Sequence, residues 1–193
     1  MVYKYLQMKL LSSYLFYLLI TLIILPFFLL ISLLIIILTG LPVIHWSKRV
    51  GHNNKLFYMA KFRTMKNNTP QLATHKLLNP DKYITSIGYF LRKSSLDELP
   101  QFINLLKLEM RIVGPRPALF NQNDLIKKRK IRKIHNLIPG ITGLAQISGR
   151  DNMSIDEKVE LDYEYLKKKS FTFDMMIISR TLKNIIFSKN ISH

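Results

Sequence analysis

A long apolar stretch near the start of the chain constrains the fold more than any other feature. Residues 10–47 contain no charged residue, and most of these positions are Leu, Ile, Phe or Tyr. A secretory signal peptide would have a much shorter apolar core with a small-residue cleavage pattern behind it, which does not follow here. The sequence therefore predicts a membrane-inserted helix over residues 1–47, broken at Pro26, and a second domain over residues 48–193.

The length of the stretch limits how it can sit in a bilayer. As one straight helix, residues 10–47 would extend about 57 Å at about 1.5 Å per residue, whereas the hydrocarbon core is about 30 Å thick. Pro26 divides the stretch into two arms before the helix-breaking Gly40-Leu41-Pro42. Each arm is on the short side for a full crossing.

Basic residues flank the stretch on both sides. They are Lys4 and Lys9 before it, and Lys48, Arg49, Lys55, Lys61 and Arg63 after it. The preference for positive charge on the cytoplasmic side would place both flanks there. A re-entrant helix, bent at Pro26 and leaving through the leaflet that it entered, satisfies both flanks, and we expect this form. The alternative is a tilted single span in which Pro26 is only a kink.

The charge of the chain points to anionic partners. Lys and Arg number 29 against 12 Asp and Glu, for a formal net charge of +17. Phosphates, nucleic acid and acidic membrane surfaces all fit such an excess, and charge alone does not choose among them. The chain has no cysteine, which excludes disulfides and thiolate metal sites and fits a reducing compartment.

Two short segments after the membrane stretch are predicted to form a hairpin. Residues 47–51 and 56–60 alternate loosely between polar and apolar, and the second segment runs into Lys61 and Arg63. These two side chains are two positions apart, so on an extended segment both point to one face, where with Thr64 they could grip a phosphate. A solvated strand face or contact with lipid headgroups is the alternative.

Two adjacent carboxylates, Asp97 and Glu98, stand just before Pro100. The apolar residues around them have helical spacing: Leu99, Phe102, Ile103, Leu106 and Met110. Because proline is tolerated only in the first turn, we predict that this helix begins near Leu96 or Asp97. Free N–H groups at a helix start favour ionised carboxylates. Ordinary capping accounts for acidic residues there equally well, so the pair alone does not indicate chemistry.

Two arginines are candidates to act with this pair. A helix predicted over residues 83–93 ends in Arg92, which would lie near Asp97, unless it only complements the helix dipole. Arg116 stands between Pro115 and Pro117, which fix the backbone and so could aim its guanidinium at a phosphate. A buried structural ion pair is the alternative for Arg116.

Five motifs in order give the chain a family resemblance. They are Lys61-Phe62-Arg63-Thr64-Met65, Leu91-Arg92-Lys93-Ser94-Ser95-Leu96-Asp97-Glu98-Leu99-Pro100-Gln101, Val113-Gly114-Pro115-Arg116-Pro117, Pro139-Gly140-Ile141-Thr142-Gly143-Leu144-Ala145-Gln146 and Gly149-Arg150. Behind a proline-broken membrane segment, this set resembles the bacterial sugar transferases, the small monotopic phosphoglycosyl transferases. The resemblance runs from about residue 10 to about residue 187.

The resemblance implies a reaction at the bacterial inner membrane. Family members transfer a sugar-1-phosphate from a UDP-sugar to polyprenyl (undecaprenyl) phosphate and release UMP, which starts a glycan such as O-antigen, capsule or exopolysaccharide. It implies that Asp97 is the nucleophile that forms an acyl-phosphate, and that Glu98 handles protons or positions groups. A covalent intermediate divides transfer between a soluble donor and a lipid acceptor into two half-reactions.

The resemblance and the charge of a diphosphate together suggest the binding residues. We expect Mg²⁺ near the acidic pair, with Asp97 as a ligand, and cations on the phosphates. The candidates for substrate binding are Lys61, Arg63, Arg92, Arg116, Gln146 and Arg150. The glycine turn at residues 139–143 could bring backbone N–H groups to a phosphate or uracil, or could be purely structural.

The C-terminal third supplies further expectations. The basic cluster at residues 127–133 lacks interleaved aromatic residues, so we expect contact with anionic membrane lipid and no nucleic acid partner. The resemblance implies that Asp162, in a helix over residues 155–166, supports the site. Residues 171–186 are amphipathic and are expected to form a helix in the membrane interface, or else one packed on the domain.

These expectations amount to one fold and one main function. The fold is α+β and mainly helical, with a re-entrant membrane helix, a small cytoplasmic catalytic domain over residues 48–193 and interfacial C-terminal helices. Homo-oligomers are possible. The rival function is a membrane-tethered basic protein that binds anionic lipid or nucleic acid without catalysis, which leaves Asp97, Glu98 and Arg116 without a role.

Overall fold

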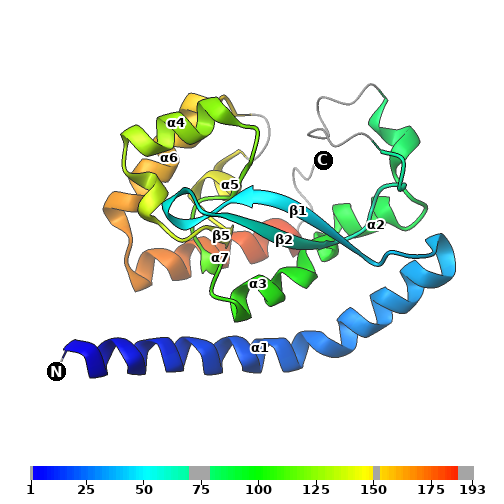
Figure 1. Ribbon diagram of the computed structural model, residues 1–193, viewed down its shortest axis with the longest axis horizontal. Coiled ribbons are helices and arrows are strands. Elements are labelled where there is room, and N and C mark those ends of the chain that lie inside the picture. Colours follow the sequence, from blue (N-terminus) through cyan, green and yellow to red (C-terminus); the bar gives the residue numbers. More distant parts are fainter. Residues whose placement is uncertain (1, 70–78, 150–152, 187–193) are drawn as a thin grey trace.

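The computed structural model describes residues 2–69, 79–149 and 153–186, and its first element is one long helix. Helix α1, Val2–Thr39, is continuous and contains Pro26. It bends in its second half, as a proline that removes a backbone hydrogen bond favours (Figure 1). Within α1, Tyr14–Thr39 is long and apolar enough to cross a membrane. The prediction of an apolar membrane-type helix at this end is confirmed, but the helix continues through Pro26 without a break and ends at Thr39.

Helix α1 packs lengthwise on the rest of the protein instead of leading away from it. Before Pro26, Tyr17 lies in a buried cluster with Phe57 and Met59. After Pro26, Ile31 and Ile35 are buried with residues of the following domain. The outward face of the helix leaves large apolar side chains exposed, among them Leu19, Ile23, Phe27, Leu30 and Ile37.

The predicted hairpin is present and longer than expected. Strand β1, Ile44–Val50, pairs antiparallel with β2, Leu56–Phe62, in a register that sets Ile44 opposite Phe62 and Val50 opposite Leu56. The short strand β4, Ala118–Leu119, adds to the other edge of β1. This sheet brings the segment around residue 117 next to the hairpin. The boundary predicted after Ser47 lies within β1.

The helical region that follows is more broken than its apolar pattern predicts. A 3-10 turn, Pro80–Tyr83, precedes helix α2, Gly88–Lys93. The next helix begins at Leu96, as predicted, but as a 3-10 helix, Leu96–Gln101, that continues into α3, Phe102–Leu106. The apolar spacing predicted a helix reaching Met110. This was wrong because the chain turns at Leu108, whose φ is +56°.

The second half of the domain closes around a pair of parallel strands. Strand β3, Arg111–Val113, pairs with β5, Gly140–Thr142. The helices of this half are α4, Asn123–Ile131; a 3-10 turn, Ile134–Asn136; α5, Leu144–Ser148; α6, Ile155–Lys168; and α7, Phe171–Ile186. A capping box between Ser154 and Glu157 starts α6.

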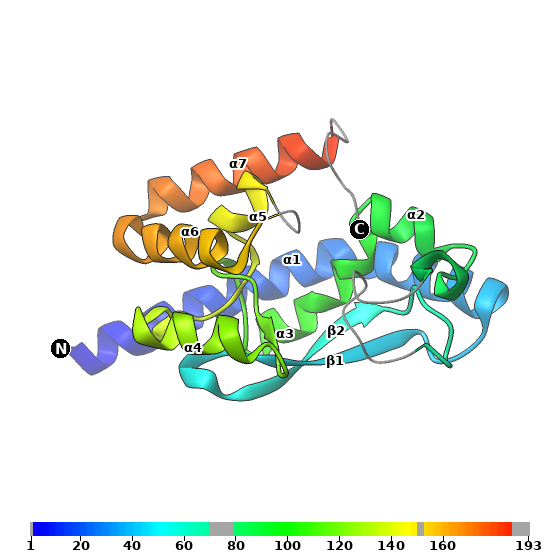
Figure 2. The same cartoon turned by 90° about the horizontal axis from the view of Figure 1, so that it is seen from above.

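Helices α4 and α7 bear on the expected lipid contacts. Figure 1 shows α4, which carries most of the basic cluster at residues 127–133, and α1 on opposite sides of the hairpin. Figure 2 shows α7 running beside α5 and α6. Ile177 of α7 is fully buried with Val113 and Tyr165, while Phe171 and Leu182 are exposed. The α+β class is confirmed, and one face of α7 serves the core of the domain.

Candidate active site

Asp97 lies buried at the start of the 3-10 helix Leu96–Gln101. Ser95 precedes this helix with a φ of +58°, and it makes no side-chain cap. Asp97 and Glu98 both lie in the first turn of this helix, which is where the capping alternative places them. The Asp97 side chain is 7% exposed, and its Oδ2 lies 3.4 Å from Lys61 Nζ. Its other oxygen, Oδ1, is buried and has no hydrogen-bond partner among the described residues. One oxygen of this buried carboxylate thus has no hydrogen-bond partner in the described part of the chain.

Glu98 is held by two cations on a single oxygen. Its Oε1 accepts hydrogen bonds from Lys61 Nζ at 2.8 Å and from Arg116 Nη2 at 3.0 Å. Burial raises the pKa of Glu98, but Lys61 and Arg116 outweigh burial and hold this pKa well below its usual range. Glu98 is therefore firmly ionised in the free protein.

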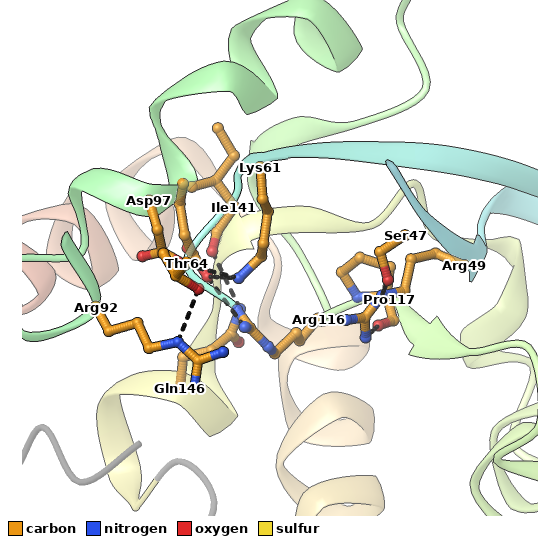
Figure 3. A network of polar contacts seen from close by, with 11 residues as sticks. Ser47, Arg49, Lys61, Thr64, Arg92, Asp97, Arg116, Pro117, Ile141 and Gln146 are labelled. Carbon is orange, nitrogen blue, oxygen red and sulfur yellow. Dashed lines mark hydrogen bonds and ion pairs between the residues drawn. The ribbon is translucent and has the colours of Figure 1, made fainter. Parts of the chain in front are cut away.

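Lys61 reaches both carboxylates because of its place on β2. Side chains alternate along a strand, so Lys61 shares the face of Phe57 and Met59, which are buried beneath the hairpin. Its side chain is largely buried, which strengthens its attraction to the carboxylates relative to a solvated pair. Figure 3 shows the Lys61 amino group pointing into the polar network that also contains Asp97.

Arg92 approaches the same polar network from the side opposite Lys61 (Figure 3). Its Nε donates to Thr64 Oγ1 at 2.9 Å, which orients the guanidinium (Figure 3). Burial lowers the pKa of Arg92, and the charge of Asp97 partly offsets this effect. The predicted helix end at Lys93 therefore brings Arg92 within electrostatic reach of the acidic pair.

Arg116 enters the site from the loop between β3 and β4. Its side chain is 39% exposed, so it is neither fully buried nor a plain surface residue. Its pairing with Glu98 gives the ion-pair alternative a partner, although the Arg116 side chain is only partly buried. Two further arginines bind the backbone of this loop: Arg129 Nη1 donates to the Arg116 carbonyl at 2.8 Å, and Arg49 Nη1 donates to the Pro117 carbonyl at 3.3 Å.

Arg63 lies elsewhere, although the sequence predicted it beside Lys61. Strand β2 ends at Phe62, so the two-residue alternation that would place both cations on one face does not reach Arg63. Its guanidinium instead binds the end of α1 and the segment after it, donating to the carbonyls of Thr39, Gly40 and Pro42 at 2.9, 2.6 and 2.6 Å. The structure thus gives Arg63 a capping role.

Of the two remaining predicted residues, the structure describes Gln146. Gln146 lies on α5, where its Nε2 donates to the Ile141 carbonyl at 3.4 Å and its Oε1 is buried without a partner in the described part of the chain. Arg150 lies outside the described residues.

The glycine turn at residues 139–143 packs tightly against the loop that carries Arg116. A Cβ on Gly140 would lie 2.1 Å from the backbone nitrogen of Gly114, and one on Gly143 would lie 2.2 Å from the Gly114 carbonyl oxygen. No side chain fits at such distances, so both glycines are needed for close backbone contact. This contact supports the structural alternative for the turn.

Sequence reasoning missed the part that Arg49 plays in the site. Arg49 was read only as a flanking charge, but its Nε donates to Ser47 Oγ at 3.0 Å and its Nη1 reaches the loop of Arg116. Burial, followed by repulsion from Arg116, lowers the pKa of Arg49 to about 10. No local pattern distinguishes Arg49 from its neighbour Lys48, which is exposed.

The donor atoms present fit a single Mg²⁺ ion bound together with a phosphate ligand. Among the described residues there is no group of three His, Cys, Asp or Glu side chains that could hold a metal. Mg²⁺ commonly uses one or two carboxylates and completes its shell with water and substrate phosphates. Asp97 can supply such a carboxylate, because its Oδ1 has no hydrogen-bond partner among the described residues and its Oδ2 has a long 3.4 Å contact with Lys61 Nζ.

Two known proteins match this chain over most of their own length. The chain is 40% identical over 153 residues to the uncharacterized sugar transferase EpsL of Bacillus subtilis, covering 79% of this chain and 74% of EpsL. It is 35% identical over 180 residues to the exopolysaccharide production protein ExoY of Rhizobium meliloti, covering 85% of this chain and 79% of ExoY.

A longer relative carries a more specific name. The UDP-glucose:undecaprenyl-phosphate glucose-1-phosphate transferase of Escherichia coli is 38% identical over 173 residues, covering 85% of this chain but only 37% of the relative. The chain also spans only 35% of the galactosyl transferase CpsE of Streptococcus agalactiae. Residues 4–188 match the family described as bacterial sugar transferase. The chain therefore belongs to the bacterial sugar transferase family, as its motifs predicted.

Proposed function

We propose that this protein transfers a sugar-1-phosphate from a UDP-sugar to polyprenyl phosphate through a covalent intermediate on Asp97. The observation that carries the proposal is a buried carboxylate with one free oxygen, set among cations. Lys61 contacts Asp97 directly, and Arg92 lies within electrostatic reach of it. Such an arrangement suits a nucleophile that must approach a doubly charged diphosphate.

In the first half-reaction, Asp97 Oδ1 attacks the phosphorus that bears the sugar. A bond forms between the carboxylate oxygen and phosphorus, and the bond from phosphorus to the oxygen bridging to UMP breaks. UMP leaves with that electron pair. In the second half-reaction, a phosphate oxygen of the polyprenyl phosphate attacks the same phosphorus and frees the Asp97 carboxylate. The lipid diphosphate sugar is the product.

Lys61 and Arg116 are the proposed diphosphate-binding cations. Both point at Glu98 Oε1 in the free protein, which shows that a single anionic oxygen can engage the two together. Arginine recognises phosphate in a planar, two-donor geometry that lysine cannot copy. Mg²⁺ held at Asp97 would neutralise charge on the phosphates when bound.

For Glu98 the geometry favours a positioning role. Its depressed pKa makes it a weak proton acceptor as long as both cations contact it. As an ionised carboxylate, Glu98 orients Lys61 and Arg116 and balances their charge while no donor phosphate is bound. Proton handling remains the alternative for the step in which the lipid attacks.

We propose that α1 is re-entrant in the inner membrane and that the domain lies on the cytoplasmic face. Tyr17 and Ile35 both pack on the domain, one on each side of Pro26. A helix that crossed the bilayer would draw one of these contacts, and the polar surface beside it, into hydrocarbon. A helix bent along the membrane surface keeps both contacts and immerses its exposed apolar face.

Cysteine labelling tests this topology directly, because the chain has no native cysteine. We would compare a cysteine placed in a tag before Met1 with His52→Cys in the exposed hairpin turn. The re-entrant form predicts that an impermeant thiol reagent labels both from the cytoplasmic side only. Labelling of the two cysteines from opposite sides would establish a spanning helix.

Turnover is tested with UMP release. Purified protein would be given a panel of UDP-sugars with undecaprenyl phosphate and Mg²⁺. The proposal predicts UMP release with at least one donor, together with a lipid diphosphate sugar. The rival binding function predicts salt-sensitive association with acidic vesicles and no UMP from any donor.

A further inference from the structure

We propose that Arg129, anchored by Asp162, is a positioning residue that holds the backbone of Arg116 so that its guanidinium faces the acidic pair. The inference rests on the proposed function for the role of Arg116. It assigns a task to one member of a basic cluster that the sequence indicated as a lipid contact. The contacts involved lie on the backbone of the Arg116 loop.

Arg129 turns inward from α4 and bridges two different elements. Its Nε and Nη2 donate to Asp162 Oδ2 at 2.9 and 2.5 Å, and its Nη1 donates to the Arg116 carbonyl at 2.8 Å. Its side chain is 12% exposed and that of Asp162 is 2% exposed. Helix α6, which carries Asp162, is thereby connected through Arg129 to the loop of Arg116.

The Arg116 loop needs such an external contact. Pro115 and Pro117 have no N–H group, so this loop has fewer backbone donors with which to fix itself. The carbonyls of two successive residues, Arg116 and Pro117, are instead bound by guanidinium groups from α4 and β1. Arg129 binds the first of them over the shorter distance, and it alone of the two is tied to a buried carboxylate.

A second ion pair between α4 and α6 shows by contrast that the Arg129–Asp162 pair is not a surface pair. Arg132 on α4 pairs with Glu160 on α6, but these side chains are 41% and 62% exposed. Exposed pairs of this kind contribute little to stability, whereas a buried pair is costly to desolvate unless its hydrogen bonds are satisfied. Arg129 and Asp162 meet that condition by including the Arg116 carbonyl.

The decisive variant is Arg129→Lys. A lysine keeps a positive charge for Asp162 but lacks the fork of nitrogens that reaches the carbonyl at the same time. We expect a folded protein with a lowered melting temperature, because hydrogen bonds of a buried pair are lost. We also expect a donor KM raised on the order of 10-fold and a lower kcat/KM, because small displacements of a positioning group are costly. Arg132→Lys is the matched control and should change neither constant. A loss of folded protein alone would leave the donor KM unchanged.

A double-mutant cycle tests whether Arg129 acts through Arg116. With Arg116→Gln already present, Arg129→Lys should change kcat/KM by less than about 2-fold, since residues that act through one another are not additive. The same 10-fold effect in both backgrounds, or a wild-type KM in Arg129→Lys, would overturn the inference. Should Arg129→Lys fold poorly, the pair replaced as Arg129→Met with Asp162→Leu removes the contact without leaving a buried charge.

A measurement independent of turnover separates this inference from the proposed function. The Nε–H NMR signal of Arg116 can be assigned by its disappearance in Arg116→Gln. We expect this signal to shift or broaden in Arg129→Lys and to stay in place in Arg132→Lys. An unchanged signal in Arg129→Lys would refute the positioning role. If the wild-type protein releases no UMP from any donor but the signal does shift, the proposed function fails and the positioning role stands.

Discussion

Lys61 Nζ lies 2.8 Å from Glu98 Oε1, although 37 positions separate the two residues in the sequence. This contact joins strand β2 to the 3-10 helix that carries the acidic pair. Under the proposed function, it also supplies a cation for the diphosphate of the donor. In the free protein Glu98 pairs with Lys61, and under the proposed function a donor phosphate takes the place of Glu98 as the partner of Lys61. The predictions on the reaction rest on this exchange.

Loss of the Lys61 amino group should weaken donor binding and slow formation of the adduct. We expect Lys61→Gln to raise the donor KM at least about 10-fold, because a hydrogen bond between charged groups contributes about 1.5–3 kcal/mol. Steady-state UMP release measures the effect. Lys48→Gln, on the exposed face of the same hairpin, is the control and should behave as wild type.

Removal of the Arg63 guanidinium should affect folding more than catalysis. Arg63 makes five hydrogen bonds to Thr39, Gly40, Pro42 and Asn67. We expect Arg63→Ala to lower the free energy of unfolding by about 2–4 kcal/mol, since several carbonyls lose a charged donor. Thermal unfolding in detergent measures this, and turnover per folded molecule should change little. A folded Arg63→Ala protein with greatly weakened donor binding would restore Arg63 as a phosphate ligand.

Substitution of Gly140 should disturb the Arg116 loop through the backbone. An added Cβ would meet the backbone nitrogen of Gly114 at 2.1 Å, so β3 and β5 must move apart. We expect Gly140→Ala to destabilise the protein by about 1–3 kcal/mol. Gly149→Ala is the comparison, because among the described residues its Cβ would meet only the flexible side chain of Met153. Equal melting temperatures for the two variants would contradict this account of the turn.

The ion pairs of Glu98 should make part of the stability depend on pH. Because the pKa of Glu98 is lower in the folded protein than in the unfolded chain, its contribution is present above the unfolded pKa of about 4.3. The contribution is lost as pH falls through the folded pKa. We expect Glu98→Gln to melt below wild type at pH 7 and the difference to shrink below about pH 4. A difference that stays constant over this range would contradict the assignment.

The sequence predicted much of the local structure, and its failures have identifiable causes. The hairpin and the helix start at Leu96 followed from alternation and from Pro100. The direction of Arg63 did not, because one residue decides whether it belongs to β2. Nor does a run of basic residues show that Arg129 alone turns inward, since its partner Asp162 is 33 positions away. Partners this distant are set by tertiary packing.

The order of the sequence motifs was enough to predict the family and to single out the acidic pair. It was not enough to predict which residues contact that pair. The sequence placed Asp97 at a helix start and suggested that capping held it there. In the structure Asp97 lies in that first turn, with Lys61 as an added contact, and Arg49 contacts the Arg116 loop. Both contacts depend on the pairing of β1 with β2 and β4, which no single motif contains.

The most direct test of the central claim is to trap the phosphosugar on Asp97. Protein incubated with a UDP-sugar and Mg²⁺, without lipid acceptor, would be analysed by intact mass and peptide mapping. We predict one sugar-phosphate adduct on the peptide that contains Asp97, with an equal amount of UMP, and neither in a folded Asp97→Asn variant. An Asp97→Asn protein that still releases UMP and transfers the sugar phosphate to polyprenyl phosphate would contradict the account.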